Sequence, residues 1–560
     1  MPSNGVCTAV LIKSGKQYVC LSGPRWDHRK WSFSLKHTTS TKQRSFVRAL
    51  VLAGTTALST QAAADLVTLR STDGTINLQG NLIGVVDDYY LLQTALGDLR
   101  VATNRVRCEG ESCPSTKAVA ADITISGSDT IAEGLMPLLM GGYATSLDAE
   151  STVTTTATAG EFAATLVGQQ GFGDQLGTYL VKSTDATAGF AGLMDESAQL
   201  ALSARPISDS EAALLAADGA GDMTSLDQEH ILALDGLVLV VNQSNPVSQL
   251  SVSDIARIYR GEVTNWAEVG GPNLPIAVVT SDSDTAAVFN AGIFGESSPA
   301  NAPSAFTASD NVEASNYVDA NAGAIAYVGF AFKRGQKPIT LISECGIGTQ
   351  PDAFSVKTEE YTLFRRLFVY NRADNTDDMA QGFVDYAISD AANGVIRQSG
   401  FINLGVERVQ MGLSSPRART VLESGSNASE QLVANNMLAL MANSDRLSST
   451  FRFRSGSTIL DPRGQADLER LVNYLEDMPA GTNVTLVGFA DSVGAFDPNL
   501  ALSEGRATQV EAALKSLGGD RLRNVTIKAT GFGEIAPAAC NTTESGRQIN
   551  RRVETWISTQ

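Results

Sequence analysis

An aspartate and an arginine near the C-terminal end of the chain are the residues best suited by type and spacing to bind a ligand. Asp491 ends the run LVGFAD, and Arg506 follows in NLALSEGRATQVEAAL. A carboxylate and a guanidinium placed this way can hold the two charged ends of a small zwitterion through charge-assisted hydrogen bonds. For an isolated pair of this kind, an ordinary surface salt bridge is the alternative.

The surrounding sequence predicts the elements that position this pair. TNVTLVGFAD alternates apolar and polar residues and ends in small residues, as expected of a strand that runs into a turn. Ser503 is a suitable N-cap for a helix that carries Arg506, Val510 and Leu514 on neighbouring turns. This prediction places Arg506 in the first helical turn, where the helix N-terminus favours a bound carboxylate.

These segments, with FRFRSGSTILDPRG before them and NRRVETWI after them, resemble the OmpA-like peptidoglycan-binding domain over residues 447–558. The resemblance implies an α+β fold in which Asp491 and Arg506 hold the diaminopimelate of the peptidoglycan stem peptide. Ala490 stands where the family often has threonine. Supporting positions in the matching motifs are Asn499, Leu502 and Arg551.

The bulk composition limits the classes of function. A chain of 560 residues is long enough for about three domains. The net charge of −18 argues against nucleic acid and anionic membranes as partners, because both require a basic surface. Of three histidines, only His230 lies beyond the expected leader, and we interpret it as structural. We therefore expect no metal and no cofactor.

A leader pattern begins late in the sequence. A basic segment from Lys42 to Arg48 precedes the short apolar run ALVLAGTTALST and the small residues before Asp65, which predicts a signal peptide at about 42–64. A start site assigned too early and a genuine extension both explain residues 1–41. No uninterrupted apolar stretch is long enough for a transmembrane helix. We expect a periplasmic protein of a Gram-negative-type envelope, associated with peptidoglycan and the outer membrane.

Cysteine usage fits export to an oxidising compartment. Cys108 and Cys113 flank a glycine in RCEGESCP, which predicts a small disulfide loop. Zinc would need two further ligands nearby, and none are visible. Cys345 and Cys540 are either free thiols or a bridge between the second and third domains.

The mature chain divides into segments of different pattern. Residues 65–114 show short alternating runs broken by Asp-Gly and Gly turns, which predicts a small domain of β-hairpins. In residues 120–408, apolar strands alternate with helical stretches, which predicts open α/β sheets. Residues 409–446 are polar with an amphipathic end, and we interpret them as a linker and a lead-in helix. The expected fold class is multi-domain α/β.

The middle segment carries a second series of motifs. ISGSDT ends one predicted strand and opens a helix, SARPI follows another, and ALDGLVLVVNQSNPVSQL leads to IYRGEVTNW. Small residues at such a strand end let backbone N–H groups converge on an anion. This order resembles the periplasmic phosphate-binding proteins of ABC transporters, the PstS-like family, over about 122–404. The resemblance implies two α/β lobes joined by a hinge, with the ligand clamped between them.

The family pattern assigns a set of candidate ligand-binding residues but is not fully matched. The family has an aspartate where this chain has Ala204, and an arginine where it has Ser281. Arg205 is a candidate replacement cation, while Asp129 adds a negative charge. The candidate residues, taken from three segments, are Ser126, Gly127, Ser128, Asp129, Thr130, Ser203, Arg205, Ser281, Ser283 and Thr285.

Two functions remain open from the sequence. The first is a wall-anchored solute-binding protein of ABC-transporter type that captures phosphate or a related small anion and works with a transporter permease. The second is an envelope-organising protein whose binding fold has lost or changed its ligand. The chain lacks G-x-S-x-G, P-loop and H-E-x-x-H patterns, so we do not expect an enzyme.

Overall fold

The computed structural model describes most of the chain beyond the expected leader. The predicted signal peptide at 42–64 lies outside the described residues, as does Ser283. The described ranges are 66–71, 77–86, 89–94, 97–102, 106–110, 113, 120–156, 158, 160–169, 173–281, 284–295, 306–453, 460 and 462–558.

The first described unit is an antiparallel five-stranded sheet with strand order β4-β3-β2-β1-β5. Its small core is built from Val67, Leu69, Leu92 and Val106. Cys108 and Cys113 form a disulfide at the end of the last strand, as the sequence predicts. The strands are β1 (Leu66–Ser71), β2 (Asn77–Val86), β3 (Tyr89–Thr94), β4 (Gly97–Ala102) and β5 (Val106–Glu109).

The middle of the chain contains an eleven-stranded mixed sheet, whose path runs β14-β13-β15-β11-β19-β10-β6-β9-β8-β7, with β16 paired to β11. Its two ends carry separate hydrophobic cores, which divide it into two lobes. The sequence predicts strands at five apolar runs, DITISG, GLVLVVNQ, IAVVTS, AIAYVGF and RRLFVYN, and these form β6, β11, β13, β15 and β19. Both the strand prediction and the two-lobed fold are therefore confirmed.

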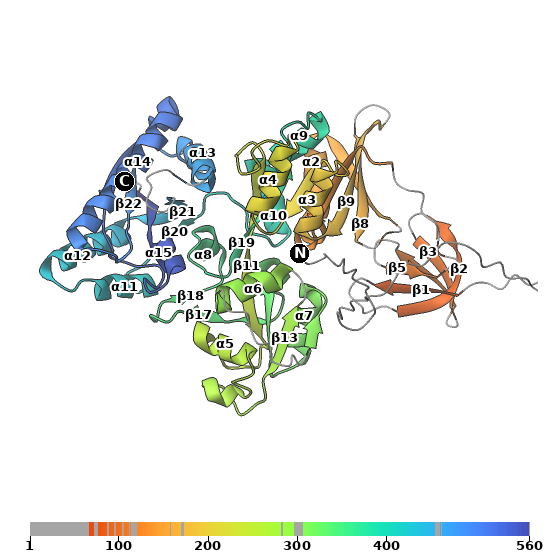
Figure 1. Ribbon diagram of the computed structural model, residues 1–560, viewed down its shortest axis with the longest axis horizontal. Coiled ribbons are helices and arrows are strands. Elements are labelled where there is room, and N and C mark those ends of the chain that lie inside the picture. The colour runs from red at the N-terminus through yellow and green to blue at the C-terminus, as the bar shows by residue number, and fades with distance from the viewer. Residues whose placement is uncertain are drawn as a thin grey trace, which may run out of the picture. The chain divides into compact units, whose positions relative to one another are not determined.

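Lobe one comprises β6–β10 with the helices packed on them, and Figure 1 shows α2, α3, α4, α9 and α10 gathered around β8 and β9. Its strands are β6 (Ile123–Ser128), β7 (Ala149–Thr155), β8 (Glu161–Gly168), β9 (Gln175–Thr184) and β10 (Leu200–Ser203). Its helices are α1 (Asp129–Gly134), α2 (Met136–Ser146), α3 (Ala186–Met194), α4 (Asp209–Ala217), α9 (Asp378–Ile388), η4 (Asp390–Ala392) and α10 (Asn393–Gln398).

Lobe two comprises β13–β15, a small three-stranded sheet and the helices α5–α8. Its strands are β12 (Gln249–Ser251), β13 (Ala277–Ser281), β14 (Phe306–Ala308), β15 (Ala324–Gly329), β16 (Lys337–Pro338), β17 (Thr340–Ile342) and β18 (Gly348–Thr349). Its helices are α5 (Val252–Tyr259), η2 (Trp266–Val269), α6 (Asp284–Phe294), α7 (Asn311–Ala320), η3 (Phe330–Phe332) and α8 (Ala353–Lys357).

Two strands run from one lobe into the other. The first part of β11 (Glu229–Val241) pairs with β19 (Phe364–Asn371), and from Leu237 onward β11 pairs with β15 of lobe two. At its far end β19 pairs with β10 of lobe one. Asp235 and Arg365 are cross-strand partners where the pairing changes. This pair therefore lies at the hinge.

The C-terminal module is a five-stranded sheet, order β20-β21-β24-β22-β23, covered by long helices. Gly488 and Gly531 are register partners, and a Cβ on either would lie within 2.6 Å of α14 atoms at Ser503 or Glu504. The elements are β20 (Arg408–Val409), β21 (Asp445–Arg452), α13 (Pro462–Glu476), β22 (Thr482–Gly488), α14 (Phe496–Gly518), η5 (Gly519–Leu522), β23 (Val525–Gly531), α15 (Glu544–Asn550) and β24 (Arg552–Ser558).

Residues 409–446 are not a linker, which corrects the sequence-based interpretation. They form α11 (Pro416–Ser424) and α12 (Ala428–Asn443), whose apolar residues share one buried cluster with the C-terminal sheet. The lead-in helix is present as α12. The cluster members on these helices are Ala418, Val421, Ala434, Met437 and Met441, packed near Val487, Phe489 and Trp556.

Candidate functional site

The predicted anion-binding loop lies at the carboxyl end of β6. The Ser128 side chain is fully buried, and its Oγ has no hydrogen-bond partner among the described residues. Gly127 has φ of +140° and lies so close to β10 that a Cβ would come 2.0 Å from the Leu202 carbonyl oxygen. The glycine is required for this packing. Asp129 accepts hydrogen bonds from the backbone N–H and hydroxyl of Thr130.

A buried ion pair lies beside this loop at the hinge. Nε and Nη2 of Arg365 donate to Oδ2 of Asp235 at 3.0 and 2.9 Å, and both side chains are almost completely buried. The other Asp235 oxygen accepts the Phe330 N–H at 2.9 Å. Burial raises the pKa of Asp235, and Arg365 opposes that shift. The pair thus holds the guanidinium in one orientation.

Arg365 also connects the two lobes. Its Nη2 donates to the hydroxyl of Thr130 in lobe one at 3.3 Å and to that of Thr285 in lobe two at 3.4 Å. Its Nη1 is buried and has no hydrogen-bond partner among the described residues. Side chains from α1, α6 and the two hinge strands therefore converge on one buried polar cluster, and Ser128 at the end of β6 lies two residues before Thr130 of that cluster. We call Ser128, Thr130, Asp235, Thr285 and Arg365 the interlobe cluster.

The sequence did not identify Arg365 or Asp235 as site residues. Asp235 stands in the ALDG motif and Arg365 opens the apolar run RRLFVYN, so both are charged residues bordering strands that must be buried. A charge in such a run needs a partner. This requirement could have pointed from the sequence to both charged residues, although it does not say which residue pairs with which.

The candidate cation Arg205 makes different contacts. Its guanidinium pairs with both carboxylate oxygens of Glu211 at 2.7 and 2.8 Å and contacts the hydroxyl of Thr187. The hydrogen bond from Arg205 is the main cause of the lowered pKa of Glu211, about 2. Arg205 therefore stabilises the start of α4.

The other predicted residues of this site make separate local contacts within their own lobes. Ser203 is fully buried and its hydroxyl donates to the Arg205 carbonyl at 2.6 Å. Ser126 is within 3.4 Å of the hydroxyl of Thr184. The Ser281 N–H donates to the Tyr327 hydroxyl at 3.0 Å.

In the C-terminal module, Asp491 lies in the turn after β22. Its Oδ2 accepts from Arg551 Nη1 at 2.8 Å, and its Oδ1 accepts the Val493 N–H at 2.9 Å. The second Nη group of Arg551 donates to Glu544 at 2.8 Å. The Asn499 side chain donates to the Asp491 carbonyl and to Glu534, which fixes the turn.

Arg506 is buried beside this pair. Its Nε and Nη1 have no hydrogen-bond partner among the described residues, and its guanidinium lies 5.5 Å from the centre of the Phe453 ring. Burial and the neighbouring Arg551 lower the pKa of Arg506, and Asp491 raises it. Arg551 pairs directly with Asp491, and the charges of both act on the buried Arg506. An acid and two bases of this kind can bind an ammonium and a carboxylate.

Two details of this site differ from expectation. Helix α14 begins at Phe496 with Ala495 as its N-cap, so Ser503 lies inside the helix and Arg506 is not in its first turn. The predicted help from a helix N-terminus is therefore wrong. The Ser503 hydroxyl instead accepts the Gly533 N–H. The predicted supporting residue Leu502 is 45% exposed.

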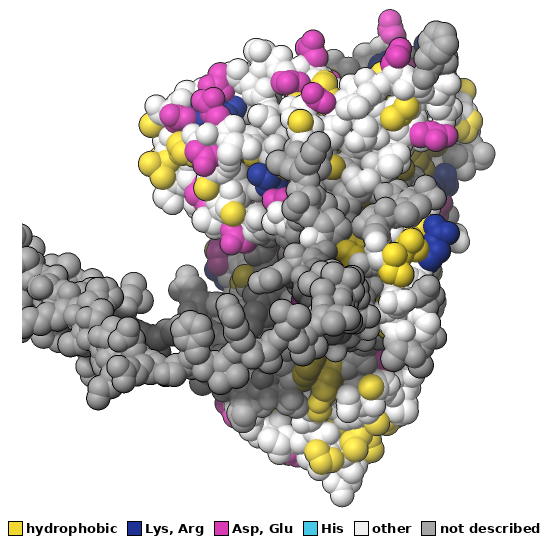
Figure 2. Space-filling view, turned by 90° about the vertical axis from the view of Figure 1, so that its right-hand side faces the viewer, with side chains coloured by type: hydrophobic (Ala, Val, Ile, Leu, Met, Phe, Trp, Pro, Cys, Tyr) yellow, Lys and Arg dark blue, Asp and Glu magenta, His cyan; other side chains and the backbone are white. Residues whose placement is uncertain are grey.

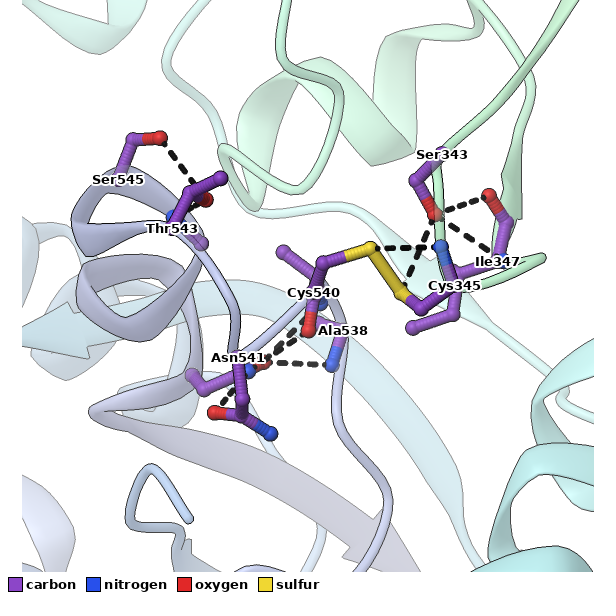
Figure 3. Close-up of a disulfide and its surroundings, with 11 residues drawn as sticks. Ser343, Cys345, Ile347, Ala538, Cys540, Asn541, Thr543 and Ser545 are labelled. Atoms are coloured by element: carbon purple, nitrogen blue, oxygen red, sulfur yellow. Dashed lines mark hydrogen bonds between the residues drawn. A yellow bond between two sulfur atoms is a disulfide. The ribbon is translucent and has the colours of Figure 1, made fainter. Parts of the chain in front are cut away.

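The disulfide between Cys345 and Cys540 joins lobe two to the C-terminal module (Figure 3). Cys345 lies in the loop between β17 and β18, and Cys540 in the loop between β23 and α15. The next residue, Asn541, accepts from the Ser492 N–H and the Asn550 amide. The bridge is therefore one residue from a side chain that holds the Asp491 turn.

A buried set of ion pairs reinforces this connection. Glu359 and Glu360 follow α8 of lobe two, and arginines surround both carboxylates, most of them from the C-terminal part of the chain. Burial alone would raise their pKa, but the arginines outweigh it and hold both values well below the usual range. Five of these arginines come from α11 and the C-terminal module: Arg452 and Arg463 around Glu359, and Arg417, Arg446 and Arg552 around Glu360. The sixth, Arg366 of β19, also pairs with Glu359.

The described surface agrees with the net charge. Acidic side chains are spread over much of the described face in Figure 2, and basic ones are sparse there. Within the described residues, no helix is both long and apolar enough to cross a membrane.

Comparison with known proteins finds two domain families. Residues 114–391 match the PBP superfamily domain, and residues 452–551 match the OmpA family. The phosphate-binding protein PstS of Bacillus subtilis is 27% identical over 177 residues, 31% of this chain and 57% of that protein. Outer membrane porin F of Pseudomonas fluorescens is 35% identical over 115 residues, 20% of this chain and 34% of that protein. The chain thus spans about a third to somewhat over half of these relatives.

Two solved structures are also similar. An ABC-type phosphate transport receptor from Vibrio cholerae is 26% identical with a TM-score of 0.37, covering 50% of this chain and 99% of that chain. The peptidoglycan-associated lipoprotein from Burkholderia pseudomallei is 29% identical with a TM-score of 0.18, covering 20% of this chain and 89% of that chain.

Proposed function

Because the chain carries a PstS-like domain of the PBP superfamily followed by an OmpA-family domain, we propose that it is a peptidoglycan-anchored solute-binding protein of the periplasm. The C-terminal module binds the stem peptide of peptidoglycan through Asp491 and Arg506. The two-lobed domain captures phosphate or a related small anion and delivers it to an ABC-transporter permease. Its position at the wall places it near the outer membrane.

The single observation that carries this proposal is the Cys345–Cys540 disulfide. It joins the two-lobed domain covalently to the module that presents Asp491, Arg506 and Arg551. A binding domain held in this way stays concentrated where its anchor is bound. The acidic surface disfavours long-range attraction of anions, so capture depends on short-range hydrogen bonds.

Two measurements on the same exported chain test the proposal. Co-sedimentation with purified peptidoglycan tests the anchor, and isothermal titration with inorganic phosphate tests the ligand. We expect retention in the peptidoglycan pellet and saturable heat from phosphate. The chain should be kept whole, because truncation before α11 removes all three arginines around Glu360 and two of the three around Glu359.

One observation favours a second function. Ala204 and Ser281 stand where the PstS-like pattern has an aspartate and an arginine, so two ligand-binding groups of that pattern are absent. In this alternative the protein organises the envelope without transport. Peptidoglycan binding without any heat of phosphate binding at millimolar concentration would favour this alternative.

A further inference from the structure

Two buried hydrogen-bond donors, one at the end of β6 and one at the hinge, lack partners among the described residues. They are Oγ of Ser128 and Nη1 of Arg365, and each belongs to a side chain at least nine-tenths buried. A buried polar group without a partner is costly, so such groups are rare in folded proteins. Arg365 contacts Thr130, two residues from Ser128, so one ligand at this loop can satisfy both donors.

The chemistry of the donors defines the ligand. Arginine has donors and no acceptor, so the ligand atom that meets Nη1 must be an acceptor. Asp235 already occupies Nε and Nη2 of Arg365 and cancels one positive charge. The remaining edge suits one oxygen of a small anion, because charge-assisted hydrogen bonds are the stronger kind.

The arrangement also explains how both lobes can contribute. Ser128 and Thr130 come from lobe one, Thr285 comes from lobe two, and Arg365 lies on the hinge strand between them. A ligand seated on Arg365 would therefore touch both halves. This position does not depend on the arginine that Ser281 replaces, or on Arg205, whose guanidinium is paired with Glu211.

We propose that Arg365, with Ser128, binds an oxygen of a small tetrahedral oxyanion such as inorganic phosphate or sulfate, and that Thr130 and Thr285 close the site from the two lobes. The proposal rests on the proposed solute-binding function and names the cation of that site. Arg365 would then take the place of the arginine that the PstS-like pattern provides elsewhere.

Isothermal titration of the full exported chain with phosphate, and separately with sulfate, tests the assignment. Arg365→Lys keeps a charge for Asp235 but loses the second guanidinium edge, and we expect about tenfold to hundredfold weaker binding. Ser128→Ala removes a partnerless hydroxyl and should weaken binding about threefold to tenfold without lowering the unfolding temperature. Arg205→Lys is the matched control and should bind as the parent does.

The outcomes separate the role of Arg365 from the proposed anion-binding function. Parent-like binding by both Arg365→Lys and Ser128→Ala, or equal weakening by Arg205→Lys, overturns the role of Arg365 while leaving the proposed function standing. No saturable heat from either anion with the parent chain overturns the anion-binding function itself. If Arg365→Lys fails to fold, Ser128→Ala still decides, because its expected loss of affinity comes with unchanged stability.

Discussion

Arg506 in the C-terminal module and Arg365 at the hinge are both 4% exposed, and both have buried donors without partners among the described residues. They differ in their relation to a carboxylate. Asp235 pairs directly with Arg365, whereas Asp491 pairs with Arg551 and only influences Arg506 at a distance. More of the Arg506 guanidinium than of the Arg365 guanidinium is therefore available to bind a ligand.

This difference shows what each site can bind. A guanidinium with no carboxylate partner can receive a whole carboxylate in bidentate fashion, and the neighbouring Asp491 can receive an ammonium. A guanidinium whose Nε and Nη2 both pair with an aspartate offers its Nη1 to one oxygen. The C-terminal site therefore fits an amino acid, and the hinge site fits a compact oxyanion.

The largest effect is expected from Arg506→Ala. Loss of the carboxylate-binding group should abolish co-sedimentation with purified peptidoglycan, and Asp491→Ala should do the same by removing the ammonium-binding group. Arg523→Ala, at an exposed arginine of the same module, is the control and should sediment normally. Retained sedimentation of both site variants would show that the module binds elsewhere.

The next prediction concerns Arg446, a buried arginine that stabilises the fold, as a contrast to Arg506 and Arg365. Both Nη groups of Arg446 donate to Glu360, and both side chains are largely buried. Glu360→Gln leaves Glu554 as the one carboxylate shared by Arg417, Arg446 and Arg552 among the described residues, and it should cost about 3–5 kcal/mol of unfolding free energy. Urea unfolding measures it. Glu469→Gln, in an exposed pair with Arg521, should cost under about 1 kcal/mol.

The two disulfides offer a third comparison, because their loops differ in length. Cys345 and Cys540 are 195 residues apart, whereas Cys108 and Cys113 are five apart. Chain entropy predicts a cost of about 5 kcal/mol for removing the longer bridge and about 2 kcal/mol for the shorter one. Paired Cys→Ser variants, compared by thermal unfolding, test this order. An equal or reversed order would contradict the prediction.

The smallest effect is the pH dependence of the interface. Both Glu359 and Glu360 have a pKa held below the ordinary 4.5 by arginines, despite burial. Their ionised forms therefore stabilise the fold above pH 4.5, and this stabilisation is lost as the pH falls further. Each group contributes at most about 1.4 kcal/mol per pH unit.

Thermal unfolding between pH 3 and pH 6 measures this slope. Glu359→Gln should make the dependence shallower, because one of the two groups no longer titrates. A midpoint that rises on acidification would contradict the sign.

The sequence predicted the elements better than the contacts between them. The five strands of the middle domain were recognisable because each is an apolar run long enough to be buried. Asp491, Arg506 and Arg551 were recognisable because their motifs follow one another within about sixty residues. Arg365 was missed, because its partners Thr130, Asp235 and Thr285 come from distant segments that only the folded sheet brings together.

Two local predictions failed for related reasons. Ser503 has the chemistry of an N-cap, but α14 continues through it because Gly488 and Gly531 let the helix lie directly on the sheet. Residues 409–446 have a polar composition typical of a linker, yet a few apolar side chains such as Met437 and Met441 suffice to bury α11 and α12. In both places tertiary packing outweighed local pattern.

The covalent link at Cys345 has a mechanical consequence. The Cys345–Cys540 bond stays closed during any opening at Asp235 and Arg365, and where the ion pairs of Glu359 and Glu360 also persist, lobe two and the C-terminal module move together. Lobe one meets α13 through a 3.4 Å hydrogen bond from Asn473 to Asp390, a contact that is readily broken. With the C-terminal module immobilised on its ligand, lobe one would therefore be the part that moves when the two lobes open and close.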